Sequence, residues 1–467
     1  MGRLIIASNR VPESDGGIGA GGLVVAVRAA FEHSDGLWFG WSGKFANSSS
    51  EHATVTETDG FTLATIDLTH NEVEGYYEGF ANRTLWPAHH GRLDLMRINH
   101  DDYLTYRRVN ARFAEALQPL LKTGDTIWVH DYHLMPLGAE LRRLGVSAKL
   151  GFFLHIPFPH KDVWAALPWH SELLDDLCAY DLVGFQTPDC QVNFSEAVQG
   201  READAAGDRP FRGHNAGREP QSGCFPISID TKGFAALAAS PQAERWRQHF
   251  ANCMGNRSWA IGVERLDYTK GLAERLKSFE TLLYQAPELH GKLSLVQIAA
   301  PSRENVAEYQ ATLATLDRLS GRINGRFGRL DWTPIHYINR SFTHTQLAAL
   351  YRVCRIGVIT PLRDGMNLVA KEYVAAQDPR DPGVLILSKF AGAAREMPDA
   401  LIVNPYDARD VAGAMQAAYK MTQDERRYRW AGLMSRLEEH DVHRWCNDFL
   451  SALAPVQSTA DVTAAAD

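Results

Sequence analysis

Short apolar runs and longer helical patterns alternate along the chain. Candidate strands in the first half are Leu4–Ser8, Leu37–Trp41, Phe61–Asp67, Thr126–His130, Leu150–His155 and Leu182–Thr187. Those in the second half are Trp259–Val263, Leu293–Ala299, Ile335–Ile338, Gly357–Thr360, Val384–Ser388 and Leu401–Asn404. Most are continuous apolar runs, as is typical of parallel strands buried on both faces. Helical patterns between them, such as Pro136–Leu144, Leu272–Gln285 and Arg409–Met421, complete repeated βα units. We predict an α/β fold with two doubly wound parallel sheets.

A polar segment divides the two halves. Residues 200–223 are rich in Gly, Arg, Asp and Pro and have no apolar periodicity, which predicts an exposed loop. The strand-like run Cys224–Ile229 follows it. We predict an N-terminal domain over 1–228, a C-terminal domain over 229–437 and a disordered small-residue tail over 457–467.

Composition narrows the class of protein. The 467 residues are 45% hydrophobic and 22% charged, with a net charge of −8, which excludes a disordered chain and argues against a nucleic-acid binder. The six cysteines form no C-x-x-C pair, which favours buried, reduced thiols. No apolar run approaches 18 residues, and the N-terminus reads as a strand rather than a leader. We expect a soluble cytoplasmic protein.

Polar clusters follow six of the predicted strands. They begin at Asn9, Asp131, His155, Glu264, Pro301 and Pro361. Ligands of open α/β sheets bind beyond the carboxyl ends of the strands. Because the clusters occur in both halves, we expect two sheets that face each other across a ligand-binding cleft.

Two cations follow the first strand of the second half, in E-R-L-D-Y-T-K-G (264–271). The guanidinium of Arg265, the ammonium of Lys270 and the loop amides together suit a diphosphate. A surface ion pair of Arg265 with Glu264 or Asp267 is the alternative, and it would contribute little energy.

The segment P-L-R-D-G-M-N-L-V-A-K-E (361–372) predicts a helix start. Gly365 permits a tight turn, Asn367 can begin the helix and Glu372 falls on the next turn. A helix N-terminus aimed at phosphate, with a carboxylate able to accept two ribose hydroxyls, suits a nucleotide. A capped helix with a solvated Glu372 fits these residues equally well.

The glycines at 17, 19 and 22 match G-x-G-x-x-G, but the context argues against NAD or FAD. Eight residues, among them Pro12, separate this motif from the preceding strand. Gly21–Gly22 precedes the apolar helix pattern Leu23–Phe31. The glycine-rich segment can therefore be interpreted either as a loop that contacts a phosphate or as an ordinary surface loop. The run H-D-Y-H (130–133) lacks metal-site spacing, and no Asp-x-Asp occurs, so we expect no metal and no cofactor.

A set of motifs, read in order, resembles one family closely. They are S-N-R (8–10), G-G-L (21–23), L-W-F-G-W-S-G (37–43), H-D-Y-H-L (130–134), F-F-L-H-I-P-F-P (152–159), E-R-L-D-Y-T-K-G (264–271), R-I-N-G (322–325) and P-L-R-D-G-M-N-L-V-A-K-E-Y-V-A-A-Q (361–377). Together they resemble the trehalose-6-phosphate synthases over roughly residues 3 to 450. The resemblance implies a GT-B fold of two Rossmann-like domains, with a C-terminal helix over 438–453 that crosses back to the N-terminal domain. It also implies retaining transfer of glucose from UDP-glucose to glucose 6-phosphate, giving α,α-trehalose 6-phosphate and UDP.

The resemblance also implies site residues. The acceptor positions are Arg10, Trp41, Tyr77, Trp86, Asp131 and Arg303, with the two arginines and Tyr77 on the phosphate and Trp86 against the sugar. The donor positions are Gly22, His155, Arg265, Lys270, Asp364, Met366, Asn367, Leu368, Val369 and Glu372. The positions nearest the chemistry are Arg265, Lys270, Asp364, His155 and Asp131. In the front-face mechanism proposed for this family, the acceptor hydroxyl attacks from the side of the leaving group, and a glycine loop over 12–22 folds over the donor.

Two alternatives stay open at this point. One is a glucosylglycerol-phosphate synthase using ADP-glucose and glycerol 3-phosphate, against which the full hexose-phosphate pocket argues. The other is a non-catalytic sugar-phosphate sensor, against which the intact Arg265, Lys270, Asp364 and Glu372 argue. The expected partners are the two small-molecule substrates and further copies of the chain in a homo-oligomer, with neither nucleic acid nor membrane.

Overall fold

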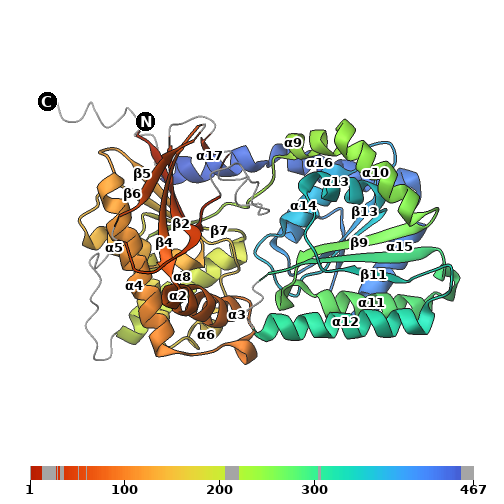
Figure 1. The fold of residues 1–467 in the computed structure, drawn as a ribbon, viewed down its shortest axis with the longest axis horizontal. Coiled ribbons are helices and arrows are strands. Elements are labelled where there is room, and N and C mark those ends of the chain that lie inside the picture. Colours follow the sequence, from red (N-terminus) through yellow and green to blue (C-terminus); the bar gives the residue numbers. More distant parts are fainter. Residues whose placement is uncertain are drawn as a thin grey trace. The chain divides into compact units, whose positions relative to one another are not determined.

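The computed structural model describes residues 2–12, 28, 30–31, 36–50, 52–58, 60–205, 220–302 and 307–453. These residues form two compact units (Figure 1). Unit 1 contains the described residues up to Phe225 together with those from His443 onward, and unit 2 contains those from Pro226 to Val442. Each unit is built on one largely parallel sheet, so the predicted α/β class with two parallel sheets is confirmed.

The sheet of unit 1 has the strand order β3-β4-β2-β1-β5-β6-β7-β8. Its strands are β1 (Leu4–Arg10), β2 (Gly36–Ala46), β3 (Thr54–Glu57), β4 (Thr62–Thr69), β5 (Thr126–His130), β6 (Lys149–Phe153), β7 (Leu182–Phe185) and β8 (Gln221–Cys224). All neighbours are parallel except β3 and β4. The sequence did not predict β3, because all four of its residues are exposed and it contains no apolar run.

The longer helices of unit 1 are α4 (His100–Leu117), α5 (Leu137–Arg143), α7 (His170–Leu177), α8 (Pro188–Ala205) and α17 (Val442–Leu453). Shorter ones are α2 (His70–Glu72), α3 (Trp86–His89), α6 (Lys161–Trp164), η2 (Leu93–Leu95), η3 (Gln118–Leu120) and η4 (Tyr132–Leu134). A π-helix, η1 (Val73–Leu85), joins α2 to α3.

Unit 2 has the strand order β11-β10-β9-β12-β13-β14, all parallel. Its strands are β9 (Ser258–Arg265), β10 (Leu293–Ala300), β11 (Ile335–Ile338), β12 (Ile356–Ile359), β13 (Val384–Ser388) and β14 (Leu401–Val403). In chain order this is the 3-2-1-4-5-6 arrangement of a Rossmann sheet, with its switch point between β9 and β12.

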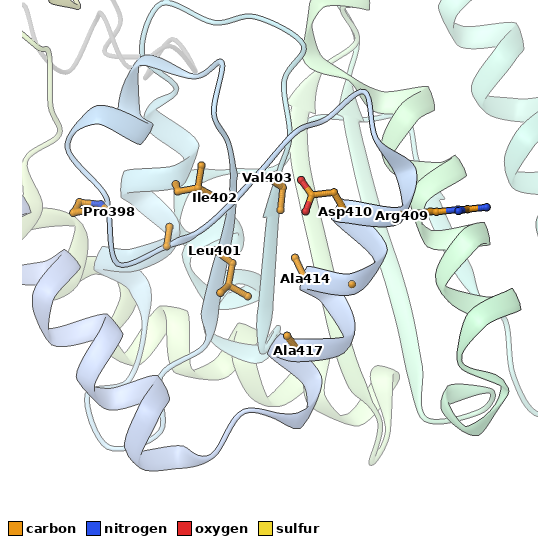
Figure 2. Close-up of a pocket in the computed structure, with 10 residues that line it drawn as sticks. Pro398, Leu401, Ile402, Val403, Arg409, Asp410, Ala414 and Ala417 are labelled. Carbon is orange, nitrogen blue, oxygen red and sulfur yellow. The ribbon is translucent and has the colours of Figure 1, made fainter.

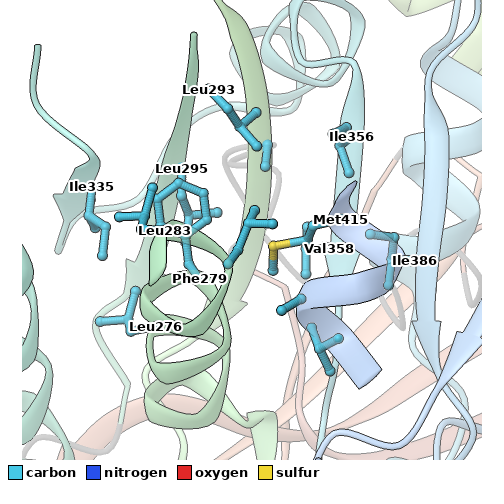
Figure 3. Packing of buried hydrophobic residues seen from close by; sticks show 14 of the residues in the cluster. Leu276, Phe279, Leu283, Leu293, Leu295, Ile335, Ile356, Val358, Ile386 and Met415 are labelled. Atoms are coloured by element: carbon cyan, nitrogen blue, oxygen red, sulfur yellow. The ribbon is translucent and has the colours of Figure 1, made fainter. Parts of the chain in front are cut away.

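The helices of unit 2 cover both faces of its sheet (Figure 1). On one side lie α11 (Leu272–Gln285), α12 (Ala307–Phe327) and α15 (Ala408–Lys420). On the other lie α9 (Thr231–Ala238), α10 (Pro241–Met254), α13 (His344–Val353), α14 (Leu368–Ala376) and α16 (Gln423–Glu439). The short helices are η5 (Tyr268–Lys270), η6 (Pro287–Leu289) and η7 (Gly392–Arg395). Phe279 and Leu283 of α11 pack with Leu295 of β10 and Met415 of α15 in the buried core beneath the strands (Figure 3).

Four local predictions are wrong. The segment 200–223 is not a loop at its ends, because α8 continues to Ala205 and β8 begins at Gln221. The run Cys224–Ile229 is not a strand, because β8 ends at Cys224 and Pro226 has no N–H to continue a ladder. The helix pattern over 438–453 is two helices, since α16 ends at Glu439 and the chain turns at His440 before α17. The cysteines are not all buried, because Cys253 is exposed and Cys224 is half-buried.

Helix α17 packs on the sheet of unit 1. The ring of Phe449 stacks on that of Trp128 in β5, with centroids 4.5 Å apart. Gly151 in β6 makes room for the helix, because a Cβ there would lie 2.8 Å from side-chain atoms of Phe449 and Leu453. Among the described residues, no helix is long and apolar enough to cross a membrane.

Candidate active site

The switch point of unit 2 brings two polar loops together. β9 and β12 pair only at Ala260 with Ile356 and at Ile261 with Gly357. Both strands then run on into polar segments, 264–271 and 361–367. At a switch point the connections leave in opposite directions, so a crevice forms beyond the carboxyl ends of the strands.

The loop after β9 is shaped to hold Lys270. The Asp267 carboxylate accepts hydrogen bonds from the backbone N–H and the hydroxyl of Thr269, both at 2.9 Å, and so fixes the turn η5. Gly271 then takes φ +65°, and a Cβ there would lie 2.2 Å from the carbonyl oxygen of Thr360. Only glycine permits this approach of the two loops. Lys270, 7% exposed, donates from Nζ to Asp364 Oδ2 at 2.6 Å.

The second loop ends at the N-terminus of α14. Asn367 adopts φ 86°, a region that asparagine tolerates, and its Oδ1 accepts from the N–H of Ala370 at 3.1 Å. Its Nδ2 donates to Asp364 Oδ2, also at 3.1 Å. The N–H groups of Leu368 and Val369 lie in the first turn, where an α-helix offers them no carbonyl partner. The loop therefore presents backbone donors beside the Lys270–Asp364 pair.

Glu372 lies one turn into α14, on the same face as Leu368. The hydroxyl of Tyr351 lies 3.5 Å from its Oε2. Burial, with a smaller contribution from Glu264, raises the pKa of Glu372 to about 7. A carboxyl group in this state readily gives up its proton when a ligand supplies hydroxyl donors.

A buried ionic network lies behind these loops. Arg275 is 0% exposed, and it donates to Gln297 Oε1 at 3.0 Å and to Thr360 Oγ1 at 3.1 Å. Its Nη2 also lies 3.5 Å from Oε1 of Glu264, the penultimate residue of β9. Burial raises the pKa of Glu264, while the charges of Arg275 and Lys270 lower it. The network holds β9, β10, β12 and α11 in register beneath the site.

In unit 1, Arg10 ends β1, and its guanidinium lies against β2. Its Cζ is 5.8 Å from the centroid of the Trp41 ring. Gly43, at φ +88°, leaves space for it, because a Cβ on Gly43 would lie 2.5 Å from Arg10 Nη2. Tyr76 of the π-helix donates from its hydroxyl to Asn9 Oδ1 at 2.8 Å and so ties η1 to the end of β1.

A row of aromatic rings runs from Trp41 to Trp86. Trp41 contacts Tyr77 at 6.1 Å between centroids, and Tyr77 stacks on His133 at 5.7 Å. Tyr132 lies 3.9 Å from the ring of His133 and 5.7 Å from that of Trp86. Tyr132 and His133 thus connect Tyr77 and Trp41 to Trp86 through ring contacts, and all of these rings except Tyr77 are buried. Tyr132 and His133 were not among the predicted site residues, although both lie in the polar cluster that follows the strand ending at His130.

The π-helix explains how Tyr77 and Trp86 reach the same row. Trp86 follows Tyr77 by nine positions. In an α-helix nine residues make two and a half turns, about half a turn out of phase. The i→i+5 hydrogen bonds of η1 widen the helix, so nine residues make about two turns and both rings return to one face. Helical periodicity of the usual kind could not have revealed this.

Asp131 and His155 follow the adjacent strands β5 and β6. Asp131 has φ 75° and accepts at Oδ1 from the backbone N–H of His155 at 3.2 Å. The Nε2 of His155 lies 3.0 Å from Nδ1 of His130, and its Nδ1 lies 3.4 Å from the side-chain nitrogen of Gln186. Burial lowers the pKa of His155 to about 3, so the ring is neutral near pH 7.

The predicted residues therefore fall into two groups, each within one unit. Arg10, Trp41, Tyr77, Trp86, Asp131 and His155 lie in unit 1, and Arg265, Lys270, Asp364, Met366, Asn367, Leu368, Val369 and Glu372 lie in unit 2. Gly22 and Arg303 lie outside the described residues, as do most of the glycine loop, residues 206–219 and the tail. Within the described ranges, no group of three or more His, Cys, Asp or Glu side chains is placed to hold a metal ion.

A separate hollow lies at the edge of unit 2. It has a volume of about 560 Å³ between the edge strand β14 and α15, lined by Leu401, Val403, Asp410 and Ala414 among others (Figure 2). It contains none of the predicted site residues. Its lining is mainly small and apolar, apart from Arg409 and Asp410 at the start of α15.

Comparison with known proteins identifies the family. The family model described as Glycosyltransferase family 20 matches residues 9–455. The chain belongs to this family. The resemblance drawn from the motifs is thereby confirmed, and so is the prediction of a glycosyltransferase with a GT-B fold.

Individual relatives are similar over nearly their whole length. A trehalose-6-phosphate synthase of Sinorhizobium fredii is 48% identical over 97% of this chain and 98% of its own. A solved α,α-trehalose-phosphate synthase (UDP-forming) from Burkholderia xenovorans, in complex with glucose-6-phosphate, is 45% identical, with a TM-score of 0.91 over 97% of this chain and 100% of that one. A solved E. coli protein bound with UDP-2-fluoro glucose is 42% identical, with a TM-score of 0.90 over 97% of this chain and 99% of that one.

Proposed function

We propose that this chain transfers glucose, with retention of configuration, from UDP-glucose to glucose 6-phosphate, giving α,α-trehalose 6-phosphate and UDP. The observation that carries the proposal is the buried Lys270–Asp364 pair beside the N-terminus of α14, at the switch point of a Rossmann sheet. Family membership and the ligands of the two solved relatives agree with it. The relatives give no support to the glycerol-phosphate or sensor alternatives.

On the donor side, Arg265 and Lys270 bind the diphosphate. The backbone of Met366, Asn367, Leu368 and Val369 and the loop residue Gly22 surround the donor, while His155 and Asp364 contact its glucose. Glu372 accepts hydrogen bonds from two ribose hydroxyls. As the glycosidic C–O bond to UDP breaks, negative charge grows on the diphosphate, and preorganised cations stabilise it without reorganisation of solvent.

On the acceptor side, Arg10, Arg303 and Tyr77 bind the phosphate of glucose 6-phosphate. Trp86 and Trp41 pack against the sugar, and Asp131 accepts from its hydroxyls. The acceptor hydroxyl attacks the anomeric carbon from the side on which UDP departs. Its proton passes to the departing phosphate oxygen, so the new C–O bond replaces the old one with retention.

One assay tests the reaction directly. The purified chain receives UDP-, ADP- or GDP-glucose, each with glucose 6-phosphate or glycerol 3-phosphate, and the released nucleotide is measured. We expect UDP release that depends on glucose 6-phosphate, and an α,α-linked product by NMR. Absence of UDP release with that pair overturns the proposal. ADP release with glycerol 3-phosphate alone would favour the alternative synthase.

The proposal also covers the cellular location and the oligomeric state of the protein. We expect it to act in the cytoplasm and as a homo-oligomer. Light scattering of the eluting protein measures the second expectation, and a monomer at micromolar concentration would contradict it.

Replacing Gly43 with alanine is expected to weaken acceptor binding. The new methyl group would displace the Arg10 guanidinium, because the position of its Cβ lies 2.5 Å from Nη2. Loss of a hydrogen bond to a charged group costs about 1.5–3 kcal/mol, so the KM for glucose 6-phosphate should rise about 10- to 100-fold. The KM for UDP-glucose should stay the same.

Gly60→Ala is the matched control for this change. Gly60 has φ +98°, so alanine there suffers comparable backbone strain, but a Cβ would meet nothing within 4 Å. This variant should lose stability without losing acceptor affinity. An equal rise in KM in both variants would mean that strain, and not Arg10, is responsible.

Binding of UDP is expected to release protons near pH 7. Glu372 has a pKa of about 7 in the ligand-free protein, so about half of it is protonated at that pH. Two ribose hydroxyls favour the ionised form, which lowers the pKa and expels the proton; affinity therefore rises with pH across this range. Calorimetry in buffers of different ionisation enthalpy should detect up to about half a proton per UDP.

Glu372→Gln serves as the reference in that measurement. It keeps the shape of the side chain but cannot titrate, so protons that come from UDP itself remain and those from Glu372 disappear. Equal proton release by both proteins would remove Glu372 from the ribose contact.

A further inference from the structure

Two neutral histidines are hydrogen-bonded at the ends of β5 and β6. His130 is 0% exposed, and its Nδ1 lies 3.0 Å from Nε2 of His155. Burial lowers the pKa of both rings below the ordinary value, and the proximity of His155 lowers that of His130 further. A bond between two neutral imidazoles needs one N–H and one lone pair. Either His130 donates to His155 or the reverse, and the two cases give His155 opposite tautomers.

The surroundings of His130 decide between the two cases. Its other nitrogen, Nε2, is buried and has no hydrogen-bond partner among the described residues. The rings of Trp128 and Trp445 pack on it, with centroids at 4.6 and 6.2 Å. Indoles carry an N–H and no acceptor nitrogen, so they offer Nε2 nothing to donate to. A buried N–H without an acceptor is rarer and more costly than an unfilled lone pair. The proton of His130 therefore belongs on Nδ1.

This assignment fixes the state of His155. Its Nε2 accepts from His130, so its single proton lies on Nδ1. Nδ1 is the ring nitrogen that can face a ligand, since Nε2 is occupied by the hydrogen bond from His130. Gln186 lies 3.4 Å from Nδ1 through its side-chain nitrogen, and a protonated Nδ1 requires the amide to present its oxygen instead. A sugar hydroxyl that accepts from Nδ1 would take the place of this long contact.

We propose that His130 is a positioning residue for the donor sugar: it holds the ring of His155 and keeps the His155 proton on Nδ1, which donates to a hydroxyl of the donor glucose. The contact of His155 with that sugar rests on the proposed function. The tautomer does not, because it follows from contacts within unit 1.

The tautomer is measured first, on the whole unmodified protein. Histidine labelled with ¹⁵N distinguishes protonated from unprotonated ring nitrogens, and His155→Gln identifies the signals of His155. We expect a protonated Nδ1 and an unprotonated Nε2 in both His155 and His130. A proton on Nε2 of His155 overturns the proposal, whether or not the protein is active.

The kinetic test uses His130→Phe, which keeps a ring of similar size but removes the donor. Loss of one hydrogen bond weakens binding by a factor of about 3 to 10. The KM for UDP-glucose should rise by this factor, while the affinity for UDP alone and the KM for glucose 6-phosphate should not change. His130→Asn, whose amide N–H can take the place of Nδ1–H, should recover most of the loss.

The outcomes separate the two proposals. An unchanged KM for UDP-glucose in a folded, active His130→Phe overturns the role of His130. A parallel loss of UDP and glucose 6-phosphate affinity would mean a general distortion of the sheet and would overturn it as well. If the unmodified protein does not use UDP-glucose, the proposed function fails, while the ¹⁵N result still decides the tautomer. If His130→Phe does not fold, His130→Asn and the ¹⁵N measurement remain decisive.

Discussion

Replacing Lys270 with alanine is expected to lower kcat about 10²- to 10³-fold. Lys270 is buried and held 2.6 Å from Asp364, so its ammonium is in place before the diphosphate begins to gain charge. Loss of one such preorganised donor typically costs about that factor, because water cannot replace it in a shielded site. The KM for glucose 6-phosphate should change little. Steady-state kinetics with both substrates varied measures the two effects separately.

Two further variants isolate the charge of Lys270. Lys270→Met keeps the aliphatic stem and should be as slow as the alanine variant if the ammonium is what matters. Lys277→Ala on α11 removes an exposed lysine, paired with Glu274 at 3.7 Å, and should leave kcat unchanged. Full turnover in Lys270→Ala would refute the assignment of the diphosphate site.

Arg275→Met is expected to destabilise unit 2 by about 3–5 kcal/mol. The change removes the arginine that pairs with Glu264, which is 5% exposed, and breaking a buried ion pair from one side costs about this much. It also removes the donors to Gln297 and Thr360. Urea titration with amide hydrogen exchange of β9 and β10 as the readout follows unit 2 by itself.

The matched variants for Arg275 test the cause of the loss. Arg322→Met breaks a pair with Glu280 at 2.6 Å, but that arginine side chain is 50% exposed, so the cost should be about 1 kcal/mol or less. The double variant Arg275→Met with Glu264→Gln removes both charges and should regain a large part of the stability. If it is no more stable than Arg275→Met alone, lost packing and not the stranded carboxylate explains the effect.

Local sequence was sufficient for much of unit 2. The strands β11 and β13 and the helix α11 have the predicted bounds, because continuous apolar runs and helical periodicity are properties of adjacent residues. The loops after β9 and β12 were also predicted to be ligand-binding, since the carboxyl ends of parallel strands share one edge. Motif order then identified the family, which the family model confirms.

Other features depend on contacts between residues that are distant in the chain. Pro226 argues against a strand over the whole of 224–229, but where β8 begins and ends depends on its pairing with β7. The break between α16 and α17 at His440 also depends on distant contacts. α16 belongs to unit 2, whereas α17 packs on Trp128 of unit 1. The aromatic row needs the wide turn of η1, and Tyr132 and His133 join it only through β5.

The sequence by itself determined the fold class, the family and the chemistry of the candidate residues. These follow from residue types, their spacing and their order. The tertiary structure decided that His130 and His155 lie within hydrogen-bond distance, that the Arg10 guanidinium fills the space beside Gly43, and how Arg275 and Glu264 share the core beneath Lys270. Each of these depends on burial and on distances of about 3 Å between strands far apart in sequence, and such distances exist only once the sheets have formed.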